Sequence, residues 1–298
     1  PLAENGKPAN IKWVEIRGNV NTRLHRLHEP PNSATTLEGV VLAFAGIQRL
    51  HNDPAGKIAL RALLLHVRWM VMPLKECPTA PAQGSLALEC RKEDLETIRA
   101  LSLLNDPKAL ATSEQERMLL KQWGGGCHQR FGATAIDHPS LGNLLYVRGK
   151  KSDGTAVCET RWQEPGKPRG KQSWNGKQWR MMGQEEPLLP TLPSLVGKMV
   201  FLSHWRALHY RLQLGTLPQS RVWTSGTASW YKLAKKGVWV EGCAEGLGFE
   251  WMKTVLGRAV LGLGDSKDWH VLTHHSAGRA WKGILPLQNV HATYRLSE

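Results

Sequence analysis

Residues 199–228 read MVFLSHWRALHYRLQLGTLPQSRVWTSGTA, and this stretch decides the fold of the last third of the chain. It predicts an apolar strand over 199–203, a helix over 205–214 and a second strand over 221–224. The alternation continues with strands predicted over 238–241, 270–273 and 290–294, and helices over 227–236, 248–256 and 277–285. Such regular alternation predicts a doubly wound parallel sheet, which we place in a domain over 191–298.

The N-terminal third of the sequence also alternates between strand and helix patterns. Strands are predicted over 11–16, 39–45 and 85–90, and helices over 22–28, from Gly46 onward, over 58–72 and over 92–104. The proline-rich stretch 72–84 interrupts this pattern and predicts a loop between domains. We therefore expect a first α/β domain over 1–105.

The middle of the chain has a different pattern. A helix is predicted to begin at Thr112 or Ser113, with Glu114 and Glu116 in its first turn, and to end at three glycines that present Cys127 on a tight turn. Residues 144–148 and 155–162 predict a β-hairpin, and 165–193 an extended hairpin plus linker. These features indicate a small α+β domain over 106–190.

Composition narrows the class of protein and partner. No apolar run approaches the ~20 residues of a membrane span, so we expect no membrane partner. The five cysteines are odd in number and lack a CxxC pair, and no HxxxH pair lies on a predicted helix, which argues against disulfides and metal sites and favours a cytoplasmic location. The net charge of +14 indicates anionic ligands, but no Lys/Arg block of five occurs. Discrete carboxylate or phosphate pockets therefore fit better than nucleic acid, which we do not expect as a partner.

Four motifs carry a family resemblance. They are RGNVNTRL at 17–24, VVLAFAGIQRL at 40–50, PAQGSLALECR at 81–91, and Glu116-Arg117 ahead of Gly125-Gly126-Cys127. In this order and spacing they resemble hydroxymethylbilane synthases (porphobilinogen deaminases) over residues 11 to about 162. The resemblance implies a multidomain α/β protein. Residues 1–105 would be a remnant of a periplasmic-binding-protein-like deaminase domain 2 with a returning segment of domain 1, and 106–190 the cofactor-carrying domain 3.

The resemblance also implies a chemistry: four porphobilinogens condense to hydroxymethylbilane with loss of ammonia. Cys127 would hold the dipyrromethane cofactor as a thioether, Arg17, Gly18 and Arg23 would bind cofactor carboxylates, and Gln83 and Arg117 would contact porphobilinogen or the linear tetrapyrrole. Guanidinium groups suit this role because they bind carboxylates through two parallel hydrogen bonds. The alternative is that these arginines are solvated or paired surface residues.

Two features depart from the family pattern. Gly124 replaces an acidic residue, and His128-Gln129-Arg130 replaces the usual Gln-Val-Pro after the cysteine. The family's catalytic aspartate has no counterpart here, so the catalytic residue is unknown. The resemblance implies that it comes from a missing N-terminal deaminase half, supplied in cis or in trans.

The last domain resembles one lobe of uroporphyrinogen-III synthase through VFLSH at 200–204, VWTSGTA at 222–228 and the closing strand at 290–295. This resemblance implies cyclisation by a fused lobe, with Ser225 and Thr227 binding substrate carboxylates where strands end and helices begin. The alternative for both residues is that they cap a helix. For the whole chain, the alternatives are a non-catalytic tetrapyrrole-binding or scaffold protein and a nucleic-acid-binding protein.

Overall fold

The computed structural model describes residues 10–125, 130–139, 141–151, 153–163, 186–188, 192–208, 219–252, 255 and 257–295. The chain forms two compact units. One combines residues 1–71 with residues 181–298, and the other spans residues 72–180. The three domain boundaries expected from the sequence stay a prediction.

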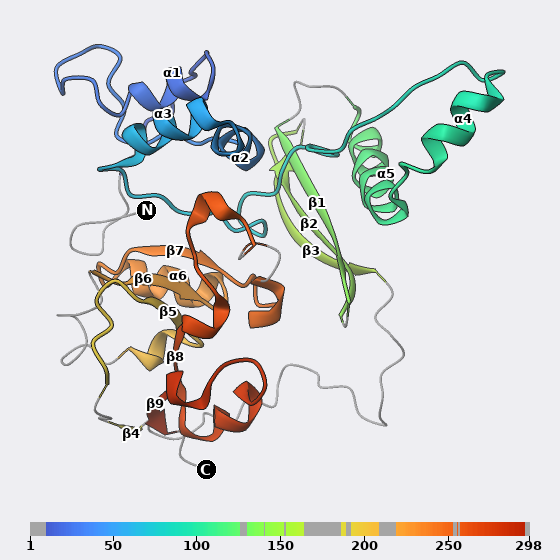
Figure 1. The fold of residues 1–298 in the computed structure, drawn as a ribbon. Helices are drawn as coiled ribbons and strands as arrows, with labels where there is room; N and C mark the ends of the chain where they lie inside the picture. Colours follow the sequence, from blue (N-terminus) through green and yellow to red (C-terminus); the bar gives the residue numbers. More distant parts are fainter. Residues whose placement is uncertain are drawn as a thin grey trace, which may run out of the picture. The chain divides into compact units, whose positions relative to one another are not determined.

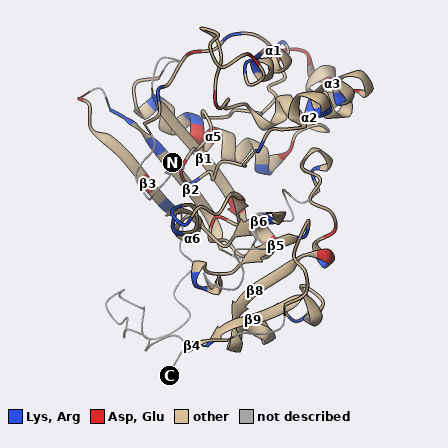
Figure 2. Cartoon of the chain, turned by 90° about the vertical axis from the view of Figure 1, so that its left-hand side faces the viewer, with Lys and Arg blue, Asp and Glu red and all other residues tan. Residues whose placement is uncertain are grey.

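Three short helices begin the first unit: α1 (Val20–His25), α2 (Phe44–Asn52) and α3 (Pro54–Leu64). Figure 1 shows them side by side, and Figure 2 shows Lys and Arg on all three. Asp53 caps α3 by accepting a hydrogen bond from Gly56 N at 2.6 Å, and Pro54 occupies the first helical position. The helices pack around buried Leu24, Leu60 and Leu63.

The strands predicted over 11–16, 39–45 and 85–90 are wrong, because none of these segments pairs with a strand among the described residues. An apolar alternating segment becomes a strand only when a neighbour takes its backbone hydrogen bonds. Without that neighbour, Trp13 is 79% exposed and Leu86 is 94% exposed. The helix predicted over 58–72 instead spans 54–64, and α1 covers 20–25 rather than 22–28.

The six-stranded sheet of the first unit confirms the parallel-sheet prediction. Its strands are β4 (Glu186–Pro187), β5 (Met199–Leu202), β6 (Arg221–Thr224), β7 (Val240–Cys243), β8 (His270–His274) and β9 (Val290–Arg295). Their order is β4-β9-β8-β5-β6-β7, and every neighbouring pair is parallel except β4 with β9. The strand order reverses between β5 and β8. This sheet and its covering segments are called the lobe below.

Each face of the lobe sheet has its own core. Because side chains alternate along a strand, Val200 and Leu202 pack on one face while Phe201 packs on the other. Helix α6 (Thr227–Ala234) covers the first face with Trp230 and Leu233.

Short 3-10 turns rather than α-helices cover the second face. They are η4 (Phe249–Met252), η5 (Ala259–Leu261) and η7 (His275–Trp281), so the helix predicted over 277–285 is wrong. The helix predicted over 248–256 begins as the 3-10 turn η4, and Val255 is helical, while residues 253, 254 and 256 lie outside the described residues. Glycines with positive φ interrupt these segments, including Gly248 at +91° and Gly283 at +84°. The helix predicted over 205–214 begins as a 3-10 turn, η2 (Trp205–Ala207), and its residues from 209 lie outside the described residues.

The segment after α3 lies along the edge of the lobe sheet beside β7. Val71 N donates to Glu241 O at 2.7 Å, and Trp239 Nε1 donates to Trp69 O at 3.1 Å. Trp69 and Val71 pack into one core of the lobe and Met70 into the other. This alternation of Trp69, Met70 and Val71 is that of an extended segment, which explains why these residues are not part of the predicted helix.

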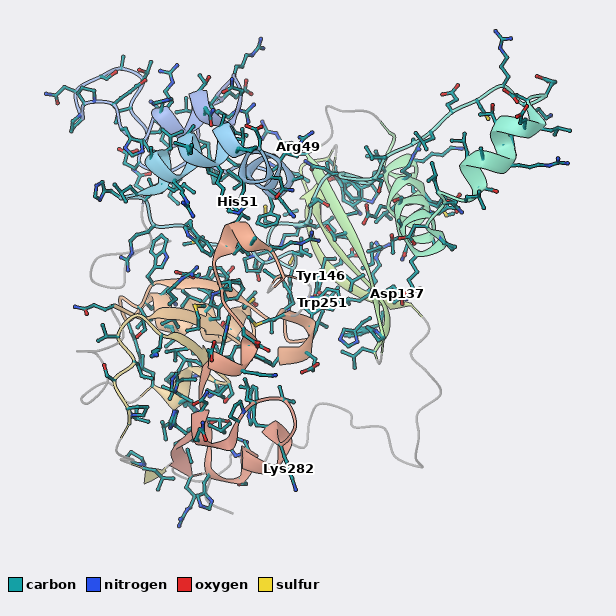
Figure 3. The ribbon with its side chains drawn as sticks, in the orientation of Figure 1. Arg49, His51, Asp137, Tyr146, Trp251 and Lys282 are labelled. Carbon is teal, nitrogen blue, oxygen red and sulfur yellow. The ribbon has the colours of Figure 1, made fainter. Side chains whose placement is uncertain are left out.

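The second unit consists of α4 (Leu95–Ser102), α5 (Pro107–Gln122) and an antiparallel sheet of β1 (Phe131–His138), β2 (Gly142–Lys150) and β3 (Ala156–Gln163). The β2–β3 hairpin was predicted, whereas β1 was not. Helix α5 begins five residues before the predicted cap, because Asp106 accepts from Lys108 N and Ala109 N at 2.9 and 3.1 Å. Asp137 of β1, labelled in Figure 3, pairs with Lys108 Nζ at 3.3 Å. The linker predicted over 165–193 lies almost wholly outside the described residues.

Candidate functional site

The RGNVNTRL motif forms a capped turn. Gly18 has φ +111°, and a Cβ built there would stand 2.9 Å from Thr22 Cγ2, so a larger residue is disfavoured on both counts. Asn19 caps α1, because its Oδ1 accepts from Thr22 N at 2.8 Å and from Thr22 Oγ1 at 2.9 Å. Arg23 Nε donates back to Gly18 O at 2.9 Å. The motif is therefore a locally closed unit that fixes Arg23.

The second motif, VVLAFAGIQRL, holds this turn in place. Leu42, Ile47 and Leu50 pack around the buried Leu24, which belongs to the first motif. Gly46 of α2 lets Val20 approach closely, since a Cβ there would lie 3.1 Å from Val20 Cγ2. Two motifs that are separate in sequence thus form one small core.

The predicted cofactor ligands Arg17, Gly18 and Arg23 lie together on this turn. Arg17 is exposed, and among the described residues no hydrogen bond or ion pair joins it to another side chain. Arg23 uses only Nε within the turn, and its two Nη groups make no hydrogen bond or ion pair among the described residues. The turn therefore offers two guanidinium groups to an anion.

The PAQG loop (residues 81–84) of the second unit is held by Glu116, which the sequence predicts in the first turn of a helix and in the motif pair Glu116-Arg117. Glu116 lies in the middle of α5 and is 7% exposed. Its Oε2 accepts from Ala82 N at 2.6 Å, and its Oε1 accepts from Ala135 N of β1 at 2.7 Å. One carboxylate thus joins the loop, the helix and the sheet.

Burial and hydrogen bonding shift the pKa of Glu116 in opposite directions. Burial raises the pKa of this carboxyl above its ordinary value, and the two backbone N–H groups partly offset that effect. Ala82 has φ +58°, which places its N–H in the loop toward Glu116 at the cost of backbone strain. The only sequence signal was the family-like Glu116-Arg117 pair, which gave no hint of its partners.

The two predicted substrate ligands of this unit occupy different positions. Gln83 is exposed on the loop, where its Oε1 accepts from Ala80 N at 3.3 Å. Arg117 is exposed on α5, next to the buried Glu116. The guanidinium group of Arg117 and the side-chain amide of Gln83 are therefore both accessible to a ligand.

Cys127 lies outside the described residues, but both ends of its connection are described. Helix α5 ends at Gln122, and Gly124 and Gly125 follow with φ +96° and +66°. The rings of Trp123 and Phe131 lie 4.5 Å apart and so hold the two ends together. The positive φ of Gly124 explains why glycine stands at the position where the resembling family has an acidic residue.

In the lobe, Ser225 and Thr227 lie at the carboxyl end of β6. Gly226 caps α6 without a side-chain hydrogen bond and Thr227 is the first helical residue, so the helix-cap alternative is wrong for both. Ser225 instead links strands through its backbone, donating to Leu202 O at 3.2 Å and accepting from Gly246 N at 2.7 Å.

The same edge of the sheet carries further polar side chains, including Ser203, whose place at a strand end the sequence also indicated. Ser203 Oγ donates to Thr273 Oγ1 at 2.8 Å, across the point between β5 and β8 where the strand order reverses. His204 follows, and its pKa is lowered to about 4 by burial first and then by Arg206 and Lys232. In open α/β sheets, ligands bind in the crevice at this position.

Within the described part of the chain, no three His, Cys, Asp or Glu side chains converge as metal ligands do. No helix in that part has the length and apolar character needed to cross a membrane.

Comparison with known proteins matches up to about half of the chain. Residues 4–99 match the family described as "Porphobilinogen deaminase, dipyromethane cofactor binding domain". The porphobilinogen deaminase of Caldicellulosiruptor saccharolyticus is 36% identical over 123 residues, which cover 41% of this chain and 36% of that protein. The enzyme of Rubrobacter xylanophilus is 37% identical over 162 residues, covering 52% and 46%. That of Trichlorobacter lovleyi is 38% identical over 147 residues, covering 48% and 42%.

The chain thus spans less than half the length of these curated relatives. The matched residues include the RGNVNTRL turn and the apolar core that holds it. Residues 4–99 are therefore similar to the cofactor-binding domain of porphobilinogen deaminases.

Proposed function

We propose that this chain contributes the cofactor-carrying part of a hydroxymethylbilane synthase, a cytoplasmic transferase that condenses four porphobilinogens with loss of ammonia. The observation that carries the proposal is the RGNVNTRL turn, where Arg17 and Arg23 lie on one closed, glycine-dependent loop. The similarity of residues 4–99 to a dipyrromethane-binding domain supports it. Porphobilinogen and the growing linear tetrapyrrole are then the ligands.

The residues of the turn fit a carboxylate-bearing cofactor. The exposed guanidinium group of Arg17 and the partly buried one of Arg23 lie on one turn and match the carboxylates of dipyrromethane, and each can form two parallel hydrogen bonds. When bound, the cofactor provides the covalent primer on which the bilane grows. Arg17 and Arg23 neutralise its carboxylates, and Cys127 holds it through a thioether. Gln83 and Arg117 contact the pyrroles that are added.

The catalytic carboxylate comes, in this proposal, from a deaminase N-terminal half in cis or in trans. An exposed apolar segment supports that partner: Ile11, Trp13 and Val14 are all exposed in one segment that lacks a strand neighbour among the described residues. The N-terminal half would supply that neighbour and bury these side chains. Hydrogen exchange of residues 11–16 should slow when the half is added. Unchanged exchange, with binding shown by another method, would contradict this partner.

Porphobilinogen consumption by the chain with that half tests the function. We expect Arg17→Lys to lower the rate about tenfold or more, because lysine keeps the charge but loses the two-pronged contact, worth ~1.5–3 kcal/mol. Arg26→Lys is the matched control, since Arg26 pairs with Glu29 at 3.4 Å beyond the turn. Equal rates for both variants would contradict the assignment of Arg17.

The lobe is proposed to act as one lobe of a uroporphyrinogen-III synthase, with Ser225 and Thr227 receiving carboxylates. Their position at the carboxyl edge of a parallel sheet supports this. Hydroxymethylbilane incubated with the chain should yield more of the type III isomer than the spontaneous type I isomer. A product ratio equal to that of buffer alone would contradict synthase activity.

A further inference from the structure

Strand β3 is the free edge of the three-stranded sheet in the second unit. The strands β1, β2 and β3 lie side by side in that order (Figure 1), and among the described residues no strand pairs with the outer side of β3. Residues 156 and 158–162 are exposed, and Trp162 is 47% exposed. An edge strand of this kind presents unpaired N–H and C=O groups, which another strand can bind.

The hairpin geometry determines which backbone groups face outward. Lys151 N donates to Thr155 O at 2.9 Å, so the backbone groups of residue 155 face β2. The pairing continues without a shift from Ala156 to Gln163, so the backbone groups of residues 157, 159 and 161 also face β2. The N–H and C=O groups that face outward, and that form no hydrogen bond among the described residues, are those of Cys158, Thr160 and Trp162.

Two charged side chains on β3 complement a second copy of the same strand. Glu159 and Arg161 share one face of β3, where Arg161 Nε donates to Glu159 Oε2 at 2.7 Å and each side chain is 43% exposed. When a second β3 lies antiparallel with Thr160 opposite Thr160, each Glu159 lies opposite Arg161 of the partner subunit. The two residues then form a non-hydrogen-bonded pair, whose Cα atoms are only ~4.5 Å apart. Four charges of alternating sign therefore meet on one face.

The charges select this register over the neighbouring ones. A two-fold axis at residue 159 would place Glu159 opposite Glu159, and an axis at residue 161 would place Arg161 opposite Arg161. Like charges directly opposite each other destabilise a sheet, whereas opposite charges stabilise it. An axis at residue 158 or 162 leaves both charges opposite uncharged residues or the hairpin loop. Charges on an edge strand commonly prevent association, but the alternating signs on β3 instead favour one pairing.

We propose that this chain forms a two-fold symmetric dimer, in which two β3 strands pair antiparallel about Thr160 and join two sheets into one. The interface is isologous, because the same edge of each copy contacts the other. The outward backbone groups of Cys158, Thr160 and Trp162 provide its hydrogen bonds, and Glu159 and Arg161 set its register. The proposal concerns the second unit alone and does not depend on the proposed function.

Sedimentation velocity of the purified chain over a range of concentrations measures the dimer. We expect Glu159→Arg and Arg161→Glu each to weaken dimerisation about tenfold or more, since each makes all four charges alike. An equimolar mixture of the two variants should dimerise again, because every charge then faces one of opposite sign. Glu114→Arg is the matched control, because it changes the net charge as Glu159→Arg does but at an exposed position of α5. It should leave the affinity nearly unchanged.

Cross-linking tests the register. Thr160→Cys should form a disulfide-linked dimer on mild oxidation, because residues opposite each other in a hydrogen-bonded pair have Cα atoms about 5.5 Å apart, which a disulfide spans. The background carries Cys77→Ser and Cys158→Ser, since both cysteines are exposed. Ala156→Cys in the same background is the control and should not cross-link, because it would lie opposite residue 164 of the partner subunit.

Three results would overturn the proposal. A chain that remains monomeric at its highest soluble concentration would exclude the dimer. A dimer that both charge reversals leave intact would have to use another surface. Slow hydrogen exchange at Cys158, Thr160 and Trp162 in a monomer would mean that another segment of the same chain occupies the edge of β3.

Discussion

Replacing Glu116 by glutamine keeps the size of the side chain but removes one of two acceptors that hold the second unit together. The carboxylate accepts from Ala82 N at 2.6 Å and from Ala135 N at 2.7 Å. An amide has one oxygen, so one of these N–H groups would face an NH2 group instead. A buried donor without an acceptor costs about 1–3 kcal/mol.

Urea unfolding followed by circular dichroism measures this cost, and hydrogen exchange locates it. We expect Glu116→Gln to lower the free energy of unfolding by about 1–3 kcal/mol and to speed exchange at Ala82 and Ala135. Glu114→Gln is the control, because Glu114 is exposed on the same helix. Stability of Glu116→Gln equal to that of the control would refute the role of Glu116 as the link between loop and sheet.

The pH dependence gives a second readout of the same residue. Burial raises the pKa of Glu116 in the folded state, so the folded chain holds this proton more tightly than the unfolded chain. The stability from this group is therefore complete at low pH and is lost as pH rises from the ordinary value of 4.5 through the folded pKa. Glu116→Gln should lack that part of the slope, and an identical slope in both proteins would contradict the raised pKa.

Three further predictions concern the first unit. Trp69→Ala should lower the free energy of unfolding by about 1–3 kcal/mol, since Trp69 stacks on Arg221 at 5.0 Å and packs into the lobe core; unchanged urea denaturation would argue against this edge contact. Gly18→Ala should lower the free energy of unfolding by about 1–3 kcal/mol, because Gly18 has a positive φ and its Cβ would approach Thr22 closely. An unchanged free energy of unfolding, measured by calorimetry, would contradict the turn geometry. Burial lowers the pKa of both His270 and His291, and Nδ1 of His270 lies 3.0 Å from Nε2 of His291. Their stability contribution is thus present above the ordinary pKa of 6.5 and lost as pH falls below it, so Tm should drop between about pH 7 and 5, and less so in His291→Gln.

The parallel lobe was predictable because its strands are buried on both faces. Residues 199–202 are a continuous apolar run, and Val222 and Trp223 form the buried centre of 221–224, so these patterns do not depend on a particular neighbour. The segments 11–16 and 39–45 have strand-like patterns as well, but a strand also needs a partner from elsewhere in the chain. Pairing is a non-local property that neither segment encodes alone.

The candidate site shows the same difference between local and non-local contacts. The turn at 17–24 is local, and its motif residues Gly18 and Arg23 contact each other directly. The role of Arg17 and Arg23 as cofactor ligands stays a prediction. The two hydrogen bonds of Glu116 join residues that lie 34 and 19 positions apart. No spacing rule predicts such contacts. Cys127 remains a prediction from its motif.

Covalent attachment of dipyrromethane at Cys127 is the central claim, and intact-mass spectrometry tests it most directly. The purified chain and its Cys127→Ser variant would be compared with and without porphobilinogen and the deaminase N-terminal half, with Cys158→Ser as the control for an exposed cysteine. The account predicts a mass increase equal to one dipyrromethane in the unaltered chain and in Cys158→Ser, and none in Cys127→Ser. An unmodified mass under every condition, with the N-terminal half bound, would contradict it.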